Sequence, residues 1–118
     1  MKRSIILSTL FLSACSVSGS EFIPSTPAEK AAFNAAQINF TSSVCMPYFG
    51  SYGVSLGDMQ RGADKYRAKA KRLGTTDDTL NAASRKAASG WDMYSAMVGE
   101  AEACKGSIQN ANILASKA

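Results

Sequence analysis

The chain has no histidine among its 118 residues, and its 3 cysteines show no CxxC spacing. The commonest general base and metal ligand is therefore missing. The glycine-containing stretch FGSYGVSLG lacks the Gly-Lys-Ser/Thr ending of a phosphate-binding loop. No segment shows the polar–apolar alternation of a half-buried strand. We therefore expect an all-helical protein that is not an enzyme, with no cofactor, no metal and no evident small-molecule substrate.

No apolar run is long enough to cross a bilayer as a helix, which takes about 20 residues. The run near the N-terminus, residues 4–12 (SIILSTLFL), is uncharged and follows the basic residues Lys2 and Arg3. A short apolar run behind a basic start is typical of a cleaved secretory signal. Its removal would lower the formal charge from +4 to +2, which is too mild to indicate nucleic acid binding.

The predicted signal ends in Leu12, Ser13, Ala14 and Cys15. This tetrapeptide resembles the lipobox of bacterial lipoproteins. The resemblance implies that residues 1–14 are removed, that the thiol of Cys15 carries a diacylglycerol, and that the new amino group is acylated. Several acyl chains give stable membrane attachment, whereas one chain binds only marginally. The resemblance therefore implies a lipid-anchored protein of the bacterial cell envelope.

Two neighbouring serines bear on this interpretation. Ser16 follows the cysteine, and in Gram-negative lipoproteins a residue other than aspartate there favours the outer membrane over the inner membrane. The alternative is an ordinary signal cut nearby, for example after Ser18, which would discard Cys15.

The rest of the chain is long enough for one small domain and a tether. Residues 15–26 are mostly small and polar and predict a flexible tether, so the domain should span residues 27–118. Cys45 and Cys104 remain in this domain, and two cysteines in an exported protein predict a disulfide. It would stabilise the fold by roughly 4 kcal/mol in the chain-entropy model. The alternative, a catalytic or metal-binding thiol, lacks supporting residues.

The first predicted helix spans residues 27–45. Thr26 and Glu29 form a capping box in the sequence TPAE, and Pro27 occupies the first helical position, where its missing N–H costs nothing. A second helix should begin after Ser55 as N-cap and end before Gly74.

A third helix should begin after Thr76 and run to about residue 104. Three such helices form an up-down-up three-helix bundle, in which the first and third are parallel and the two cysteines of the disulfide lie at one end. The third helix would be about 42 Å long, against about 27 Å for the second. Either it bends near Gly90 or Gly99, or the first helix and its loop extend further. Residues 107–118 are expected as a frayed end or a short fourth helix.

Apolar residues at helical spacing predict the packed faces. The second helix has one such stripe: Met59, Ala63, Tyr66, Ala70 and Leu73. The third has two neighbouring faces, which we expect to contact both other helices: Leu80, Ala87, Trp91, Tyr94, Val98 and Ala101 on one, and Met93, Met97, Cys104 and Ile108 on the other.

Two further groups are candidate binding surfaces. Tyr48, Phe49 and Tyr52 fall in the connection 46–54, where they are either a lid folded over the core or an exposed recognition loop. Four cations share the outer face of the second helix: Arg61, Lys65, Lys69 and Arg72. They are either a solvated face or a contact for acidic headgroups, lipopolysaccharide phosphates or an acidic protein.

Two function classes fit these features. The first is an assembly accessory protein whose partner is another envelope protein. In size, anchor and helical content the chain resembles pilotins, which hold a peptide helix in an apolar groove. The second is an inhibitor, immunity or entry-exclusion lipoprotein that blocks a periplasmic enzyme or an incoming machine. An open apolar groove would favour the first class, and a covered core with exposed loop aromatics would favour the second.

Overall fold

The computed structural model describes residues 22–118, so the predicted signal 1–14, Cys15 and most of the tether 15–26 lie outside the described residues. Within this range the chain is helical and contains no strand. The elements are α2 (Pro27–Val44), the 3₁₀ turn η1 (Met46–Tyr48), α3 (Phe49–Tyr52), α4 (Leu56–Arg72), α5 (Asp77–Val98) and α6 (Glu100–Ser116). In the described part of the chain, no helix combines the length and apolar character that a membrane span requires.

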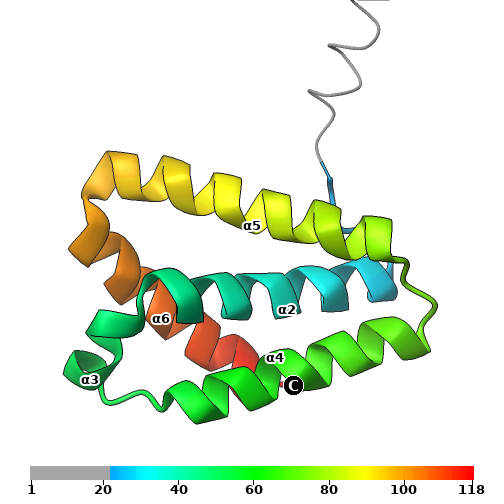
Figure 1. Cartoon of the computed structure of the whole chain (residues 1–118), viewed down its shortest axis with the longest axis horizontal. Helices are drawn as coiled ribbons and strands as arrows, with labels where there is room; N and C mark the ends of the chain where they lie inside the picture. Colours follow the sequence, from blue (N-terminus) through cyan, green and yellow to red (C-terminus); the bar gives the residue numbers. More distant parts are fainter. Residues whose placement is uncertain (1–21) are drawn as a thin grey trace, which may run out of the picture.

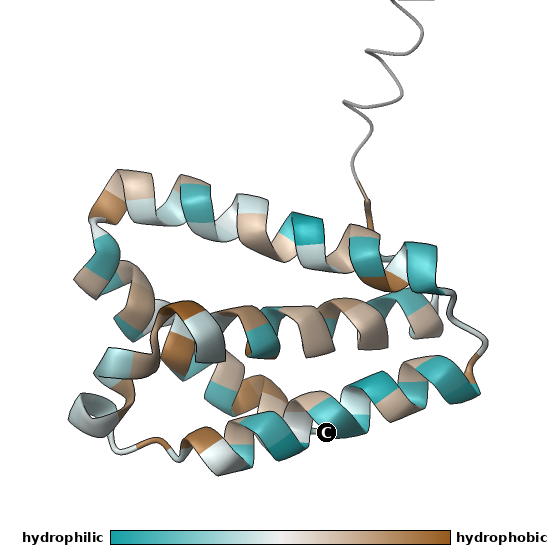
Figure 2. Ribbon diagram, in the orientation of Figure 1, coloured by the Kyte–Doolittle hydropathy of each residue, from teal (hydrophilic) through white to brown (hydrophobic). Residues whose placement is uncertain are grey.

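Helix α2 is the centre of the fold, between α4 on one side and α5 on the other (Figure 1). The predicted capping box is present, because Thr26 Oγ1 accepts a hydrogen bond from the Glu29 N–H and Glu29 Oε1 accepts one from the Thr26 N–H. Four alanines and Ile38 fill most of the buried positions of α2, with Thr41 and Ser42 at the others, and Figure 2 draws this helix mostly in apolar shades. Small side chains allow neighbouring helices to approach on several sides.

Helix α4 follows the sequence prediction closely. Ser55 is its N-cap, and Met59, Ala63, Tyr66 and Ala70 are buried. Leu73 was expected in the same stripe, but it lies just past the helix end and is 49% exposed. The stripe therefore ends one turn earlier than predicted.

The predicted third helix is two helices, so the three-helix bundle is wrong in its number of long helices. Helix α5 ends at Val98, and Gly99 adopts φ +88°, a conformation that side-chain-bearing residues rarely reach. The chain then turns back as α6, which includes most of residues 107–118 (Figure 1). Of the two glycines at which a bend was expected, Gly99 is the break and Gly90 lies within α5.

This reversal divides the second predicted apolar face. Cys104 and Ile108 are fully buried in α6, whereas Met93 and Met97 on α5 are 67% and 77% exposed. The prediction that all four pack on another helix is therefore wrong for the two methionines. An unbroken helix would have kept all four on one side, and the turn at Gly99 separates them.

The predicted disulfide is confirmed. Cys45 caps the end of α2, Cys104 lies near the start of α6, and their Cα atoms are 5.4 Å apart. Both residues are fully buried. The two cysteines meet because α6 begins where α5 ends, at the end of the bundle that α2 also reaches.

Candidate functional site

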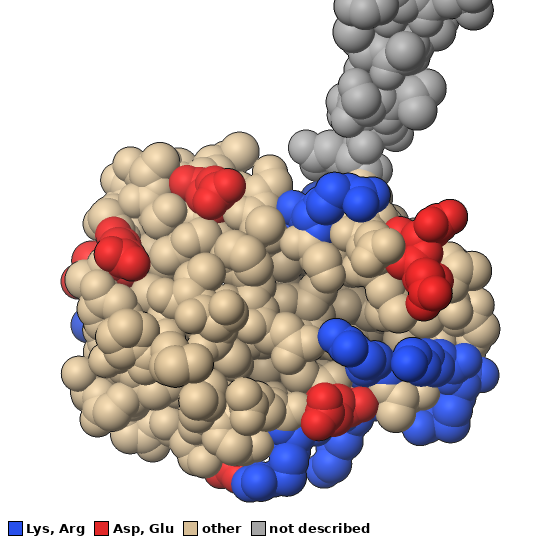
Figure 3. All heavy atoms as spheres, viewed as in Figure 1, with Lys and Arg blue, Asp and Glu red and all other residues tan. Residues whose placement is uncertain are grey.

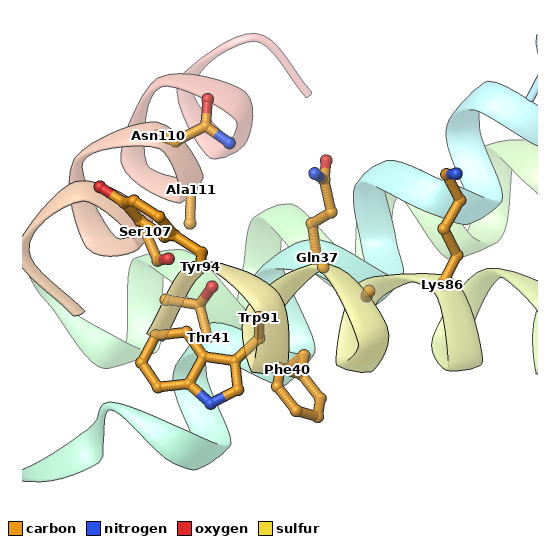
Figure 4. A pocket seen from close by; sticks show the side chains of 11 residues that line it. Gln37, Phe40, Thr41, Lys86, Trp91, Tyr94, Ser107, Asn110 and Ala111 are labelled. Carbon is orange, nitrogen blue, oxygen red and sulfur yellow. The ribbon is translucent and has the colours of Figure 1, made fainter. Parts of the chain in front are cut away.

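A groove of about 240 Å³ opens between α2, α5 and α6. Its aromatic residues are Phe40 from α2 and Trp91 and Tyr94 from α5. Figure 4 shows Trp91 and Phe40 at one end of the groove and Lys86 at the other. The remaining lining residues are small or polar: Gln37, Thr41, Ala87, Gly90, Ser107, Asn110 and Ala111.

The groove exists because the second half of α5 does not pack closely against the core. Ala83 and Ala87 are buried, but no side chain from Ser89 to Val98 is. Tyr94 crosses from α5 to α6 and lies over Gly106, where an added Cβ atom would come within 2.6 Å of the tyrosine Oη. Gly106 thus leaves the space that the Tyr94 ring occupies, and this contact forms one wall of the groove.

An exposed apolar patch adjoins the groove at the end of α5. Its residues, here called the elbow patch, are Met93, Tyr94, Met97 and Val98, which are 67%, 41%, 77% and 42% exposed. Figure 2 shows this apolar end of α5 beside the start of α6. Clustered exposed apolar residues mark interaction sites, and methionine adapts to irregular partners. The sequence analysis placed all four on faces of the predicted third helix that were expected to pack against other helices, and all four are exposed.

The aromatic connection folds as a lid. Phe49 is 5% exposed, and Tyr48 and Tyr52 are partly buried against the core. Residues 46–54 also contain η1 and α3, where the sequence indicated only a connecting loop. The alternative of three exposed aromatic side chains does not describe Phe49. A recognition role for the two tyrosines stays a prediction.

The four predicted cations of α4 are all exposed, and Figure 3 shows basic side chains gathered over this helix. Arg61 forms an ion pair with Asp58. Lys65, Lys69 and Arg72 instead line a hollow of about 280 Å³ together with Lys117, which follows α6. The sequence did not predict Lys117 as part of this face, because Lys117 reaches it only through the packing of α6 against α4.

Two titratable groups are perturbed for structural reasons. The Glu29 carboxylate accepts hydrogen bonds from the backbone N–H groups of Thr26 and Ser25, which lower its pKa. Burial raises the pKa of the Tyr66 hydroxyl, which donates a 2.7 Å hydrogen bond to the Leu114 carbonyl oxygen. Both interactions secure helix ends.

The described residues contain no group of three Cys, Asp or Glu side chains placed to hold a metal ion. The disulfide takes up Cys45 and Cys104. Three surface features stand out within residues 22–118: the groove, the elbow patch and the basic hollow.

A comparison with protein-family models, curated proteins and solved structures finds no significant match to this chain.

Proposed function

We propose that this protein is a non-enzymatic lipoprotein of the bacterial envelope, anchored through Cys15, that holds an apolar segment of another envelope protein. The observation that carries the proposal is the open groove that continues into the elbow patch. Methionine side chains that are mostly exposed beside an aromatic-lined groove gain free energy when a partner buries them.

The size of the groove favours a peptide over a small molecule. Pockets for drug-sized ligands measure roughly 300–1,000 Å³, and this groove is about 240 Å³. It has room for one or two side chains rather than for an enclosed ligand. An amphipathic helix could place such side chains against Phe40 and Trp91 and cover Met97 with the rest of its apolar face.

The position of the groove suits a lipid-anchored protein. Helix α2 begins five residues after the first described residue, and the elbow patch lies at the end of the bundle opposite the start of α2 (Figure 1). A lipid on Cys15 would therefore leave the elbow patch accessible to a partner. A pilotin-like role at the outer membrane, which Ser16 favours, is the specific form of this proposal.

The second candidate is an inhibitor, immunity or entry-exclusion lipoprotein. The observation that favours it is the position of Tyr48 and Tyr52, which are partly exposed in the segment that follows Cys45. In this case the contact surface would be η1 and α3, and the groove would be empty in the complex.

Photo-crosslinking in intact cells separates the two candidates. A p-benzoylphenylalanine at Met97 should give a discrete crosslinked product with an envelope protein. The same group at Asn81, which is exposed on α5 but outside the groove, is the matched control and should give none. Products from Tyr52 and not from Met97 would favour the second candidate, and equal products from Met97 and Asn81 would contradict both.

A further inference from the structure

The basic hollow joins two segments that are distant in the sequence. Lys65, Lys69 and Arg72 from α4 and Lys117 after α6 line it, and no acidic side chain does. The other lining residues are Tyr66, Ala68 and Ala118. Lys117 reaches this face because Gly62 of α4 lies against Ala115 of α6. The packing of these two helices thus brings a fourth cation to a row of three.

Helix propensity alone does not account for this arrangement. Like charges at i,i+4 destabilise a helix by a few tenths of a kcal/mol, and Lys65 lies between Arg61 and Lys69 at that spacing. The positions three and four residues from Lys65, Lys69 and Arg72 hold no acidic residue. The helix dipole favours Lys69 and Arg72 in the last turn of α4 and Lys117 at the C-cap of α6, but it does not explain Lys65. Against these four cations the hollow sets only the α-carboxylate of Ala118, so the excess positive charge suits an anionic ligand.

The surroundings of the hollow favour a lipid surface as the source of that charge. Leu73 follows Arg72 directly and is 49% exposed. Cations beside an exposed apolar side chain are typical of segments that lie at a membrane interface, where cations meet phosphates and the apolar side chain enters the headgroup region. Asp64 on α4 and Asp77 and Asp78 at the start of α5 are the acids closest to these residues in the sequence, and none of them lines the hollow.

The hollow lies toward the end of the domain at which α2 begins. Helix α4 lies on the opposite side of α2 from α5 (Figure 1), and the basic residues gather on α4 in Figure 3. The start of α2 and the connection after α4 line one depression, with Pro27 and Glu29 facing Leu73 and Gly74. From Cys15 to Phe22 the chain can span at most roughly 25 Å, so a lipid on Cys15 would hold this end of the domain close to a bilayer.

We propose that the hollow lined by Lys65, Lys69, Arg72 and Lys117 binds the phosphate groups of anionic phospholipids and seats α4 on the bilayer. This inference rests on the proposed membrane anchor for its orientation. With α4 on the membrane, α5 and its exposed methionines lie on the far side of α2. The domain would then present the groove to partners at a fixed height.

The test uses the mature lipidated protein with Leu73→Trp and Trp91→Phe, which makes position 73 the sole tryptophan. The protein is reconstituted into vesicles of phosphatidylcholine alone or with about one third phosphatidylglycerol, with brominated acyl chains as quenchers. We expect strong quenching only with phosphatidylglycerol and its loss in 1 M NaCl, where the Debye length falls to about 3 Å. Equal quenching in both vesicles, or none in either, would overturn the proposal.

A charge-matched pair of variants assigns the effect to the hollow. Lys65→Gln, Lys69→Gln and Lys117→Gln together should weaken docking roughly hundredfold, at about fivefold per cation near an anionic surface. The control removes the same charge from exposed positions elsewhere, with Lys30→Gln, Arg85→Gln and Lys105→Gln. It should change the strength of docking less than threefold. Equal losses in the two variants would indicate a general charge effect and overturn the assignment.

Two further arms separate the sources of failure. Inorganic phosphate at constant ionic strength should not displace the protein; displacement would reveal a small-anion site in place of a lipid surface. The chain with Cys15→Ser lacks the lipid and should still float with phosphatidylglycerol vesicles and not with phosphatidylcholine. If Cys15 proves unacylated in cells, the proposed function fails. The flotation experiment still shows whether the hollow binds anionic lipid, because it uses the chain without the acyl groups. If flotation fails and Met97 crosslinks a partner, only the lipid site is lost.

Discussion

Gly62 on α4 and Ala115 on α6 are in such close contact that a Cβ atom added to the glycine would lie 2.6 Å from the alanine Cβ and 2.8 Å from its Cα. The neighbouring Tyr66 hydroxyl donates its hydrogen bond to the Leu114 carbonyl oxygen. The end of α6 is therefore held to α4 by steric fit and by one partly buried hydrogen bond. This contact also places Lys117 in the basic hollow.

Gly62→Ala should destabilise the fold, because the Ala115 backbone atom cannot move aside as a flexible side chain would. Overpacking of this kind costs about 1–3 kcal/mol. Gly90→Ala is the matched control: it lies inside α5, with nothing within 4 Å of an added Cβ, and should raise stability by about 0.5–1 kcal/mol. Urea unfolding followed by circular dichroism measures both. Equal effects of the two alanines would contradict the close packing of α4 on α6.

Tyr66→Phe should cost about 1 kcal/mol at neutral pH, because the Leu114 carbonyl oxygen loses its donor. The folded-state pKa of Tyr66 is raised, so its stabilising contribution is complete below about pH 10 and is lost as the pH rises through the raised value. The melting temperature of the wild type should therefore approach that of Tyr66→Phe in strong alkali. A constant gap between the two proteins up to the alkaline limit would contradict this linkage.

Removal of the disulfide with Cys45→Ser and Cys104→Ser should lower the free energy of unfolding by roughly 4 kcal/mol, because the bond closes a sequence separation of 59 residues. Non-reducing and reducing gels of the mature wild type should differ in mobility. Two titratable thiols in the native protein would show that the bond is absent in the cell.

Cys15→Ala should abolish acyl labelling and leave an unlipidated precursor or a soluble product. Mass spectrometry of the wild-type N-terminus should show that residues 1–14 are gone and that acyl groups are present. Ser18→Ala is a suitable control, since it changes a nearby small residue and keeps the lipobox resemblance. Membrane partition that is unchanged by Cys15→Ala would contradict the anchor.

The caps of this protein could be predicted from sequence because each depends on a few adjacent residues. Thr26 with Glu29 and Ser55 define the starts of α2 and α4 by local hydrogen bonds, and both are found in the fold. The disulfide was predictable because residues 27–118 contain only two cysteines, Cys45 and Cys104.

The sequence limited the position of a bend in the predicted third helix to Gly90 or Gly99, but it did not decide between them or predict that the chain would turn back there. Apolar residues continue at helical spacing from Val98 to Ala101 and Cys104, and periodicity alone does not distinguish one long helix from two that fold back. The groove depends on that reversal, because it separates the end of α5 from the core. Likewise, nothing near Lys117 in the sequence connects it with Lys65, since their proximity depends on how α6 packs.

The Cys45–Cys104 bond also has a mechanical consequence for a protein that is tethered at one end and bound by a partner at the other. A pull between the tether and the elbow would pass along α2, cross the disulfide and reach Gly99 within a few residues. Helix α4 lies inside the covalent ring, off this path, and would not be stretched. Under tension, the elements exposed to unravelling would be α2 and the first turn of α6, which connects Cys104 to Gly99.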